Sequence, residues 1–169
     1  DIAMPLSLMP ARRAGEGERM VRAGQWEGWH PTQLLGLHLT GRTVGIVGMG
    51  RIGQAVAHRA RAFGLKIAYH NRKRLPEAVE RMFHARWVDS LDELMSEADI
   101  LTLHCPAGPG THHMIDTRRI GLMKDGASLI NTARGDLVDQ QALISALESG
   151  KLAGAGLDVY PDEPNVDRR

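Results

Sequence analysis

The sequence predicts an α/β fold in which one doubly wound parallel sheet carries helices on both of its faces. Two observations lead to this prediction. From residue 43 onward, short apolar runs alternate with stretches of helical pattern, and the first apolar run leads directly into a glycine-rich turn. Such alternation implies right-handed crossovers between parallel strands, which cover both faces of a sheet with helices. With 169 residues and 43% hydrophobic content, the chain can bury one sizeable core.

The individual elements follow from local pattern. Short apolar runs predict strands at residues 43–47, 66–70, 86–88, 99–103, 127–131 and 154–159. Stretches of helical pattern between them predict helices at residues 51–63, 77–83, 91–95, 117–122 and 139–149. Ser90 and Glu93 form a capping-box signature, which favours a helix beginning at residue 91. We therefore predict one α/β domain with a parallel sheet over residues 41–169.

Residues 1–40 are predicted to form a helical arm. Apolar residues alternate there with Arg and Glu, but Pro5 and Pro10 oppose one continuous helix. A proline inside a helix removes a donor and clashes with the preceding turn, at a cost of about 3 kcal/mol. We expect this segment to be broken, strained or partly disordered. Trp26 and Trp29 follow in a glycine-punctuated loop.

Composition excludes several classes of function. The formal net charge of +1 provides no overall field toward nucleic acid or a membrane surface. The single cysteine, Cys105, excludes an internal disulfide and favours a reducing, cytoplasmic location. Glycines and charges interrupt every apolar run, so no membrane span is expected. We also predict no metal site. The chain begins at Asp1 rather than Met, and we expect it to be a piece of a longer protein.

A glycine motif follows the first predicted strand and marks a phosphate-binding turn of the Rossmann type. Its first glycine permits a tight turn, its second lets the backbone approach a pyrophosphate, and its third lets helix and strand pack closely. The following helix begins with free N–H groups that favour an anion. A purely structural turn is the alternative, and methyltransferases share a similar loop. The candidate cofactor residues are Gly48, Gly50, Arg51, Ile52 and Gly53.

The end of the second predicted strand bears on the identity of the cofactor. An acidic residue about 20 positions after the glycine motif binds the ribose 2′-hydroxyl of NAD. This sequence instead has Asn71, Arg72, Lys73 and Arg74 there, and Arg suits a 2′-phosphate because its planar fork meets phosphate oxygens in pairs. We predict NADP rather than NAD, with Asn71, Arg72 and Arg74 as candidate contacts. A solvated basic loop is the alternative.

Three further stretches carry a family resemblance: residues 103–106 followed by Thr111, residues 129–135, and residues 156–164. Together with the glycine motif, they closely resemble the D-2-hydroxyacid dehydrogenases, in particular the glyoxylate/hydroxypyruvate reductase branch. The resemblance implies that Arg134 grips a 2-oxo acid and that Glu163 pairs with a catalytic histidine. It further implies that Asp158, with Thr132 and Ala133, holds the nicotinamide end, and that a wall along the cofactor is formed by Cys105, Pro106 and Thr111.

The implied chemistry suits these residue types. Hydride transfer to a ketone builds negative charge on its oxygen, so a fixed cation and a proton donor must converge there. A carboxylate beside an imidazole favours its protonated form and orients it. From spacing alone, however, Arg134 is equally well a turn residue in a surface ion pair, and Glu163 a solvent-exposed loop residue.

The resemblance also implies what this chain lacks. The catalytic histidine of the family falls beyond residue 169, and His104 is expected to be a wall residue rather than an acid. The substrate domain is absent, so the chain alone should bind cofactor and turn over poorly. In the family, the arm wraps a twofold-related partner, which favours a homodimer over a core position for Trp26 and Trp29. A 3-phosphoglycerate dehydrogenase and a nicotinamide-sensing co-repressor are the alternatives.

Overall fold

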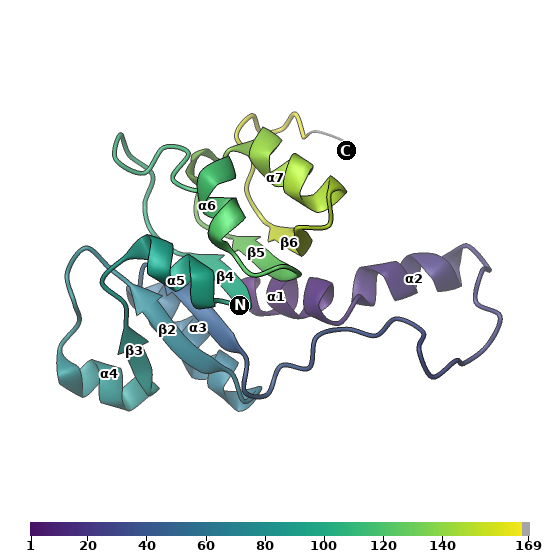
Figure 1. The fold of residues 1–169 in the computed structure, drawn as a ribbon, viewed down its shortest axis with the longest axis horizontal. Helices are drawn as coiled ribbons and strands as arrows, with labels where there is room; N and C mark the ends of the chain where they lie inside the picture. The colour runs from purple at the N-terminus through teal and green to yellow at the C-terminus, as the bar shows by residue number, and fades with distance from the viewer. Residues whose placement is uncertain (167–169) are drawn as a thin grey trace.

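The computed structural model describes residues 1–166, which contain one six-stranded sheet with every strand parallel to its neighbours (Figure 1). The strand order is β3-β2-β1-β4-β5-β6. This order reverses direction between β1 and β4, as in Rossmann-type nucleotide-binding domains, and it confirms the predicted parallel α/β fold. The strands are β1 (Thr43–Val47), β2 (Lys66–His70), β3 (Ala85–Trp87), β4 (Ile100–Leu103), β5 (Ala127–Asn131) and β6 (Leu152–Leu157).

The helices between the strands agree closely with the prediction. Ser90 caps α5 through its Oγ, which accepts from the Glu93 backbone N–H, so the predicted capping box is half formed. Strand β6 begins two residues earlier than predicted because buried Leu152 pairs with Ala127. The helices are α1 (Ala3–Ala11), α2 (Ala14–Arg22), α3 (Arg51–Ala62), α4 (Glu77–Phe83), α5 (Leu91–Glu97), α6 (Thr117–Leu122) and α7 (Gln140–Glu148), with a 3-10 turn η1 (Gly135–Leu137).

Alternate residues of the central strands point to two separate cores. On one face, Ile46 packs with Tyr69 and with residues of α1 and α3. On the other face, Val47 packs with Leu101 and with residues of α5, α6 and α7. Because both faces are covered, the strands are apolar throughout rather than alternating, which is why their positions were predictable.

Helix α1 lies directly on the last strands of the sheet. A Cβ at Gly156 would lie 2.5 Å from the Leu6 carbonyl oxygen, and one at Gly154 would lie 2.7 Å from the Pro10 side chain. These distances are shorter than carbon atoms tolerate, so only glycine permits this approach. The glycines of β6 therefore provide the surface on which α1 packs.

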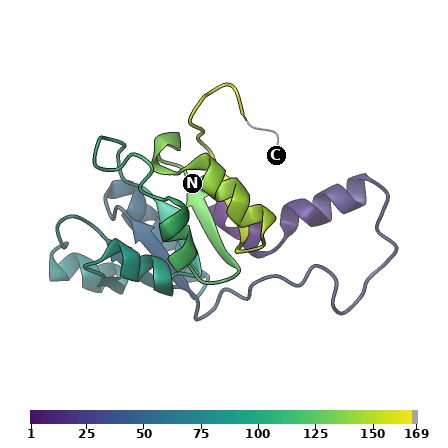
Figure 2. The same ribbon diagram turned by 45° about the horizontal axis from the view of Figure 1, so that its top comes forward.

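The predicted break in the N-terminal segment falls between α1 and α2. Arg13 adopts a left-handed conformation there, whereas Pro5 lies in the first turn of α1 and Pro10 in its last turn. Helix α2 and the irregular segment after it extend away from the sheet (Figures 1 and 2). Trp26 and Trp29 lie on this segment with exposed fractions of 56% and 78%, so neither is a core residue of this chain. No helix in residues 1–166 is both long enough and apolar enough to cross a bilayer.

Candidate functional site

The predicted site residues follow the carboxyl ends of five strands. The glycine motif follows β1, Asn71 follows β2, Cys105 follows β4, Thr132 follows β5, and Asp158 follows β6. Because the strands are parallel, these ends share one edge of the sheet. Open α/β sheets bind ligands at this edge, beside the point where the strand order reverses.

The three glycines of the motif have distinct surroundings. Gly48 has a φ of +97°, and a Cβ there would lie 2.7 Å from the His104 carbonyl carbon. A Cβ at Gly53 would lie 2.3 Å from the Gly48 carbonyl oxygen. The tight turn and the close helix–strand packing predicted for these two positions are therefore present.

Gly50 is the exception, because a Cβ there would have no atom within 4 Å. It is the N-cap residue of α3, and it offers no side chain to the free N–H groups of the first turn. Open space in front of unsatisfied donors suits an anion such as a pyrophosphate. The turn after β1 therefore presents free backbone N–H groups and open space to a small anionic group.

Asn71 joins the second strand to this turn. Its Oδ1 accepts a hydrogen bond from the Met49 backbone N–H at 2.7 Å, and the Gln54 side chain donates to the Met49 carbonyl at 3.2 Å. Asn71 thereby ties the end of β2 to the glycine turn after β1. The described residues at the end of β2 include no carboxylate before Glu77, in keeping with the sequence.

The three cations after Asn71 have different environments. Arg74 donates from Nε and Nη2 to the two carboxylate oxygens of Glu80, at 2.9 and 2.7 Å, and its guanidinium carbon lies 5.5 Å from the centroid of the Trp87 ring. Within the described part of the chain, the side chains of Arg72 and Lys73 have no hydrogen-bond or ion-pair partner. The basic cluster is therefore divided between one engaged cation and two free ones.

The segment after β4 carries the residues that were predicted to line the cofactor. Burial lowers the pKa of His104 to about 4, and its Nε2 lies 2.9 Å from the Thr102 hydroxyl. A neutral imidazole at pH 7 fits a wall residue rather than an acid. Burial raises the pKa of Cys105, which disfavours a reactive thiolate. Thr111 donates to the Pro106 carbonyl at 3.1 Å and so closes the loop on itself.

Asn131, at the end of β5, shapes the loop that carries Arg134. Its exposed fraction is 1%, its Nδ2 donates to the Arg134 carbonyl at 2.8 Å, and its Oδ1 accepts from the Ala133 N–H at 3.1 Å. Its own carbonyl accepts from the Asp158 N–H at 3.0 Å. Asn131 thus connects the two segments that were predicted to hold the nicotinamide end, a role that sequence reasoning missed.

Among the described residues, no hydrogen bond or ion pair joins Arg134 to Glu163. The Arg134 guanidinium donates to the neighbouring Ala133 carbonyl at 2.6 Å, and a Glu163 carboxylate oxygen accepts from the Tyr160 N–H at 2.8 Å. Both residues are accessible to solvent. A Cβ at Gly135 would lie 2.2 Å from the Tyr160 carbonyl carbon, so the loop of Glu163 packs tightly against the turn after Arg134.

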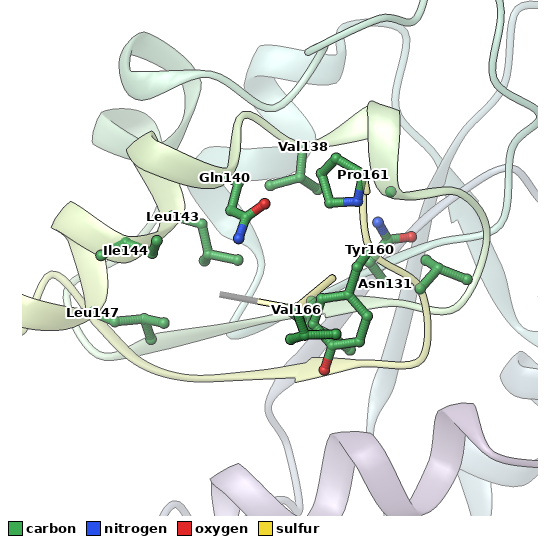
Figure 3. A pocket seen from close by; sticks show the side chains of 12 residues that line it. Asn131, Val138, Gln140, Leu143, Ile144, Leu147, Tyr160, Pro161 and Val166 are labelled. Carbon is green, nitrogen blue, oxygen red and sulfur yellow. The ribbon is translucent and has the colours of Figure 1, made fainter. Parts of the chain in front are cut away.

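Two hollows adjoin these loops. An apolar cavity of about 170 Å³ lies between α7 and the segment after β6, with Leu143, Tyr160 and Val166 in its lining (Figure 3). It contains neither Arg134 nor Glu163. A wider groove of about 640 Å³ runs between α1 and α3, and its lining includes Arg51, Ile52 and Thr132. Three of the predicted cofactor residues therefore line the groove between α1 and α3.

The fold and this edge together define a Rossmann-type dinucleotide-binding domain. The sequence model of the D-isomer specific 2-hydroxyacid dehydrogenase, NAD binding domain, matches residues 4–169. The chain therefore belongs to this family, as its motifs indicated.

Known proteins agree with the assignment. The chain is 51% identical over 168 residues to a glyoxylate reductase of Thermococcus litoralis, covering 97% of this chain and 50% of that protein. It is 45% identical to a glycerate dehydrogenase of Hyphomicrobium methylovorum, covering 99% and 52%. A solved D-isomer specific 2-hydroxyacid dehydrogenase from Polaromonas sp. JS6 66 superposes with a TM-score of 0.95 at 52% identity, covering 99% and 52%. The chain thus spans about half the length of the relatives that it matches.

Proposed function

We propose that this chain is the cofactor-binding part of an NADP-preferring dehydrogenase that reduces small 2-oxo acids such as glyoxylate or hydroxypyruvate. The observation that supports it most directly is the open space at Gly50, in front of the uncapped first turn of α3. The kinship with a glyoxylate reductase and a glycerate dehydrogenase supports the substrate class.

The proposal assigns a part of the cofactor to each loop at the carboxyl edge. The turn from Gly48 to Gly53, with Arg51 and Ile52, would hold the pyrophosphate. Asn71 and the cations after it would meet the adenosine ribose and its 2′-phosphate. Cys105, Pro106 and Thr111 would line the cofactor, and the nicotinamide end would lie beside Thr132, Ala133 and Asp158.

Preference for NADP is proposed from charge at the end of β2. An acidic residue there would bind a free 2′-hydroxyl and repel a 2′-phosphate. Asn71 is neutral and turns its side-chain oxygen to the glycine loop, while Arg72 and Lys73 remain without partners among residues 1–166. A dianionic phosphate would complement these two charges.

The bound nicotinamide would supply the hydride, and this chain would contribute the groups that receive the substrate. Arg134 is proposed to bind the carboxylate and carbonyl of the 2-oxo acid, where negative charge develops. Glu163 is proposed to orient a histidine that lies outside residues 1–169. The hydrogen bonds that Arg134 and Glu163 now make to backbone groups would be exchanged for these contacts.

A homodimer remains a proposal that rests on the N-terminal arm. Trp26 and Trp29 are exposed on a segment that extends from the body of the domain, and aromatic residues are enriched at protein interfaces. Light scattering at micromolar concentration should give twice the monomer mass. A monomer at that concentration would contradict it. A cytoplasmic location stays a prediction from the lone cysteine.

The test of cofactor binding is calorimetric titration of the chain with NADPH and NADH, together with a Gly50→Val variant. A Cβ at this position would meet no atom within 4 Å and the φ is −79°, so the backbone accepts a side chain there, and that side chain would intrude on a pyrophosphate. We expect a loss of affinity for both nucleotides of at least about tenfold, or 1.4 kcal/mol. Gly121→Ala on α6, also in open space, is the matched control and should change neither affinity.

Two outcomes would contradict the proposal. One is that neither nucleotide binds to the unmodified chain. The other is that Gly50→Val binds both as tightly as the unmodified chain does. A separate assay of this chain with glyoxylate and NADPH should show little turnover, because the chain spans only about half the length of the relatives that it matches. Rapid turnover would show that residues 1–169 suffice for catalysis.

A further inference from the structure

The pairing of Arg74 with Glu80 sets Arg74 apart from Arg72 and Lys73, the other two cations after β2. Glu80 lies on α4 with an exposed fraction of 7%, and both of its carboxylate oxygens are taken by Arg74. Its Oε1 also accepts from the Tyr69 hydroxyl at 2.7 Å. Bidentate Arg–carboxylate pairs are among the stronger polar contacts in proteins, so an approaching phosphate would have to compete with a nearly buried partner.

Tyr69 extends this arrangement to the backbone of the turn. Its ring is fully buried in β2, and its hydroxyl accepts a hydrogen bond from the Leu75 N–H at 2.9 Å. Burial is the main reason that the pKa of Tyr69 is raised to about 12, so the hydroxyl stays protonated and can donate to Glu80. The Glu80 carboxylate thus holds the Arg74 side chain directly. Through the Tyr69 hydroxyl, it also holds the backbone of Leu75, where the turn after β2 ends.

The face of the Arg74 guanidinium is also engaged. It lies over the ring of Trp87, which belongs to β3 and pairs in register with Tyr69. Arg74 is therefore turned toward α4 and the outer strand of the sheet. Arg72, by contrast, has no side-chain hydrogen bond or ion pair in residues 1–166. Of the two arginines, Arg72 is therefore the one whose guanidinium is left free to meet a phosphate.

We propose that Glu80 is a positioning residue for cofactor selection: it withholds Arg74 from the 2′-phosphate, so that Arg72 supplies the guanidinium that this phosphate meets. The inference rests on the proposed NADP-binding function and changes the role expected for Arg74. Arg74 becomes a structural residue that stabilises the packing of α4 against β2 and β3, and the contact to the 2′-phosphate is left to Arg72.

The test compares two matched substitutions, Arg72→Gln and Arg74→Gln, by titration with NADPH and NADH. Removing the Arg72 charge should weaken NADPH binding by at least about tenfold and leave NADH within about twofold, since only NADPH carries the extra phosphate. Arg74→Gln should lower the melting temperature, yet leave the ratio of the two affinities within about twofold. A fall in that ratio as large as that of Arg72→Gln would overturn the inference.

Glu80→Gln provides a second test that does not depend on the folding of the Arg74 variant. Glutamine retains an oxygen for the Tyr69 hydroxyl but releases the arginine fork. NADPH affinity relative to NADH should then stay the same or rise, because a freed guanidinium adds to the phosphate site. A selective loss of NADPH affinity would show instead that Glu80 holds Arg74 toward the phosphate, and would overturn the inference.

Tryptophan fluorescence reports on the contact between Arg74 and Trp87 independently of binding. The chain has three tryptophans, so in a Trp26→Phe, Trp29→Phe background only Trp87 emits. Glu80→Gln should change this emission as the cation leaves the ring, and Arg72→Gln should not. Unchanged emission in Glu80→Gln would contradict the structural role proposed for Arg74.

Titration of the unmodified chain separates a failure of the proposed NADP preference from a failure of the role proposed for Glu80. Equal affinity for NADPH and NADH would remove the proposed preference, and the inference with it. A clear NADPH preference that Arg74→Gln abolishes would leave the proposed function intact and refute the assignment of Glu80 alone.

Discussion

The Asn71 side-chain oxygen accepts a hydrogen bond of 2.7 Å from the backbone N–H of Met49, so the end of β2 and the glycine turn after β1 form one unit. Asn71→Asp retains an acceptor for Met49 but adds a carboxylate where NAD-binding domains carry one. We expect NADPH affinity to fall by at least about tenfold while NADH binding is kept or improved, because the carboxylate repels a phosphate and accepts from a 2′-hydroxyl. Titration with the two nucleotides measures this reversal.

Asn71→Ala is the control for that substitution. It removes the hydrogen bond to Met49 without adding charge, and it should weaken both nucleotides to a similar extent. If Asn71→Asp and Asn71→Ala gave the same ratio of affinities, charge at this position would have no part in cofactor choice.

The contact between β6 and α1 leads to a stability prediction. Gly156→Ala places a Cβ 2.5 Å from the Leu6 carbonyl oxygen, which belongs to helix backbone and cannot move alone. We expect the free energy of unfolding to fall by about 1–3 kcal/mol, the usual cost of overpacking a filled interior. Urea denaturation followed by circular dichroism measures it.

The matched control is Gly121→Ala in α6, where a Cβ meets no atom within 4 Å. Alanine favours a helix over glycine by up to about 1 kcal/mol, so this variant should be as stable as the parent or more so. Equal destabilisation by both substitutions would mean that the loss does not arise from the α1 contact.

Much of the fold was predictable because its strands are buried on both faces. Such strands appear as short apolar runs bounded by polar residues or glycine, and β1, β2 and β5 have the predicted limits. The glycine motif was informative for a similar reason, since Gly48 and Gly53 each occupy positions that no side chain could share.

Other features depend on contacts between distant residues and could not be derived from local pattern. The helix over residues 77–83 was predicted, but its rotation, which turns Glu80 inward to Tyr69 and Arg74, was not. Arg74 therefore looked like a free cation in the sequence. Asn131 ends a predicted apolar strand, and local pattern gives no sign of the three groups that it connects; its polar side chain at the end of an apolar run is the one signal present in the sequence.

Asn131 provides the next prediction. In Asn131→Ala, the Arg134 carbonyl and the Ala133 N–H both lose their side-chain partner. We expect a loss of about 1–3 kcal/mol in the free energy of unfolding, the usual cost of leaving such groups unsatisfied. Ser145→Ala, which removes one exposed hydrogen bond on α7, should cost far less and serves as the control. Equal costs in the two variants would argue against a structural role for Asn131.

The link between α5 and α6 gives a prediction about pH. Asp92 accepts hydrogen bonds from Arg118 and Arg119, which lower its pKa from 3.8 to about 2. A carboxyl whose pKa is lower in the folded state stabilises the fold above its unfolded value, and this contribution is lost as the pH falls through the folded value. The stabilisation by Asp92 should therefore be complete above about pH 5 and vanish near pH 2.

Asp92→Asn tests this by thermal unfolding at several pH values. At pH 7 the melting temperature should fall by about 1–3 °C, since the pairs are partly exposed and exposed pairs contribute at most about 1 kcal/mol. The difference in melting temperature between the variant and the parent should become smaller as the pH falls below 4 and should vanish near pH 2. Asp125→Asn breaks an ion pair with Lys151 whose carboxylate is more exposed than that of Asp92, so it should lower the melting temperature less at pH 7. A difference for Asp92→Asn that persisted unchanged at pH 2 would show that its effect arises from packing rather than from charge.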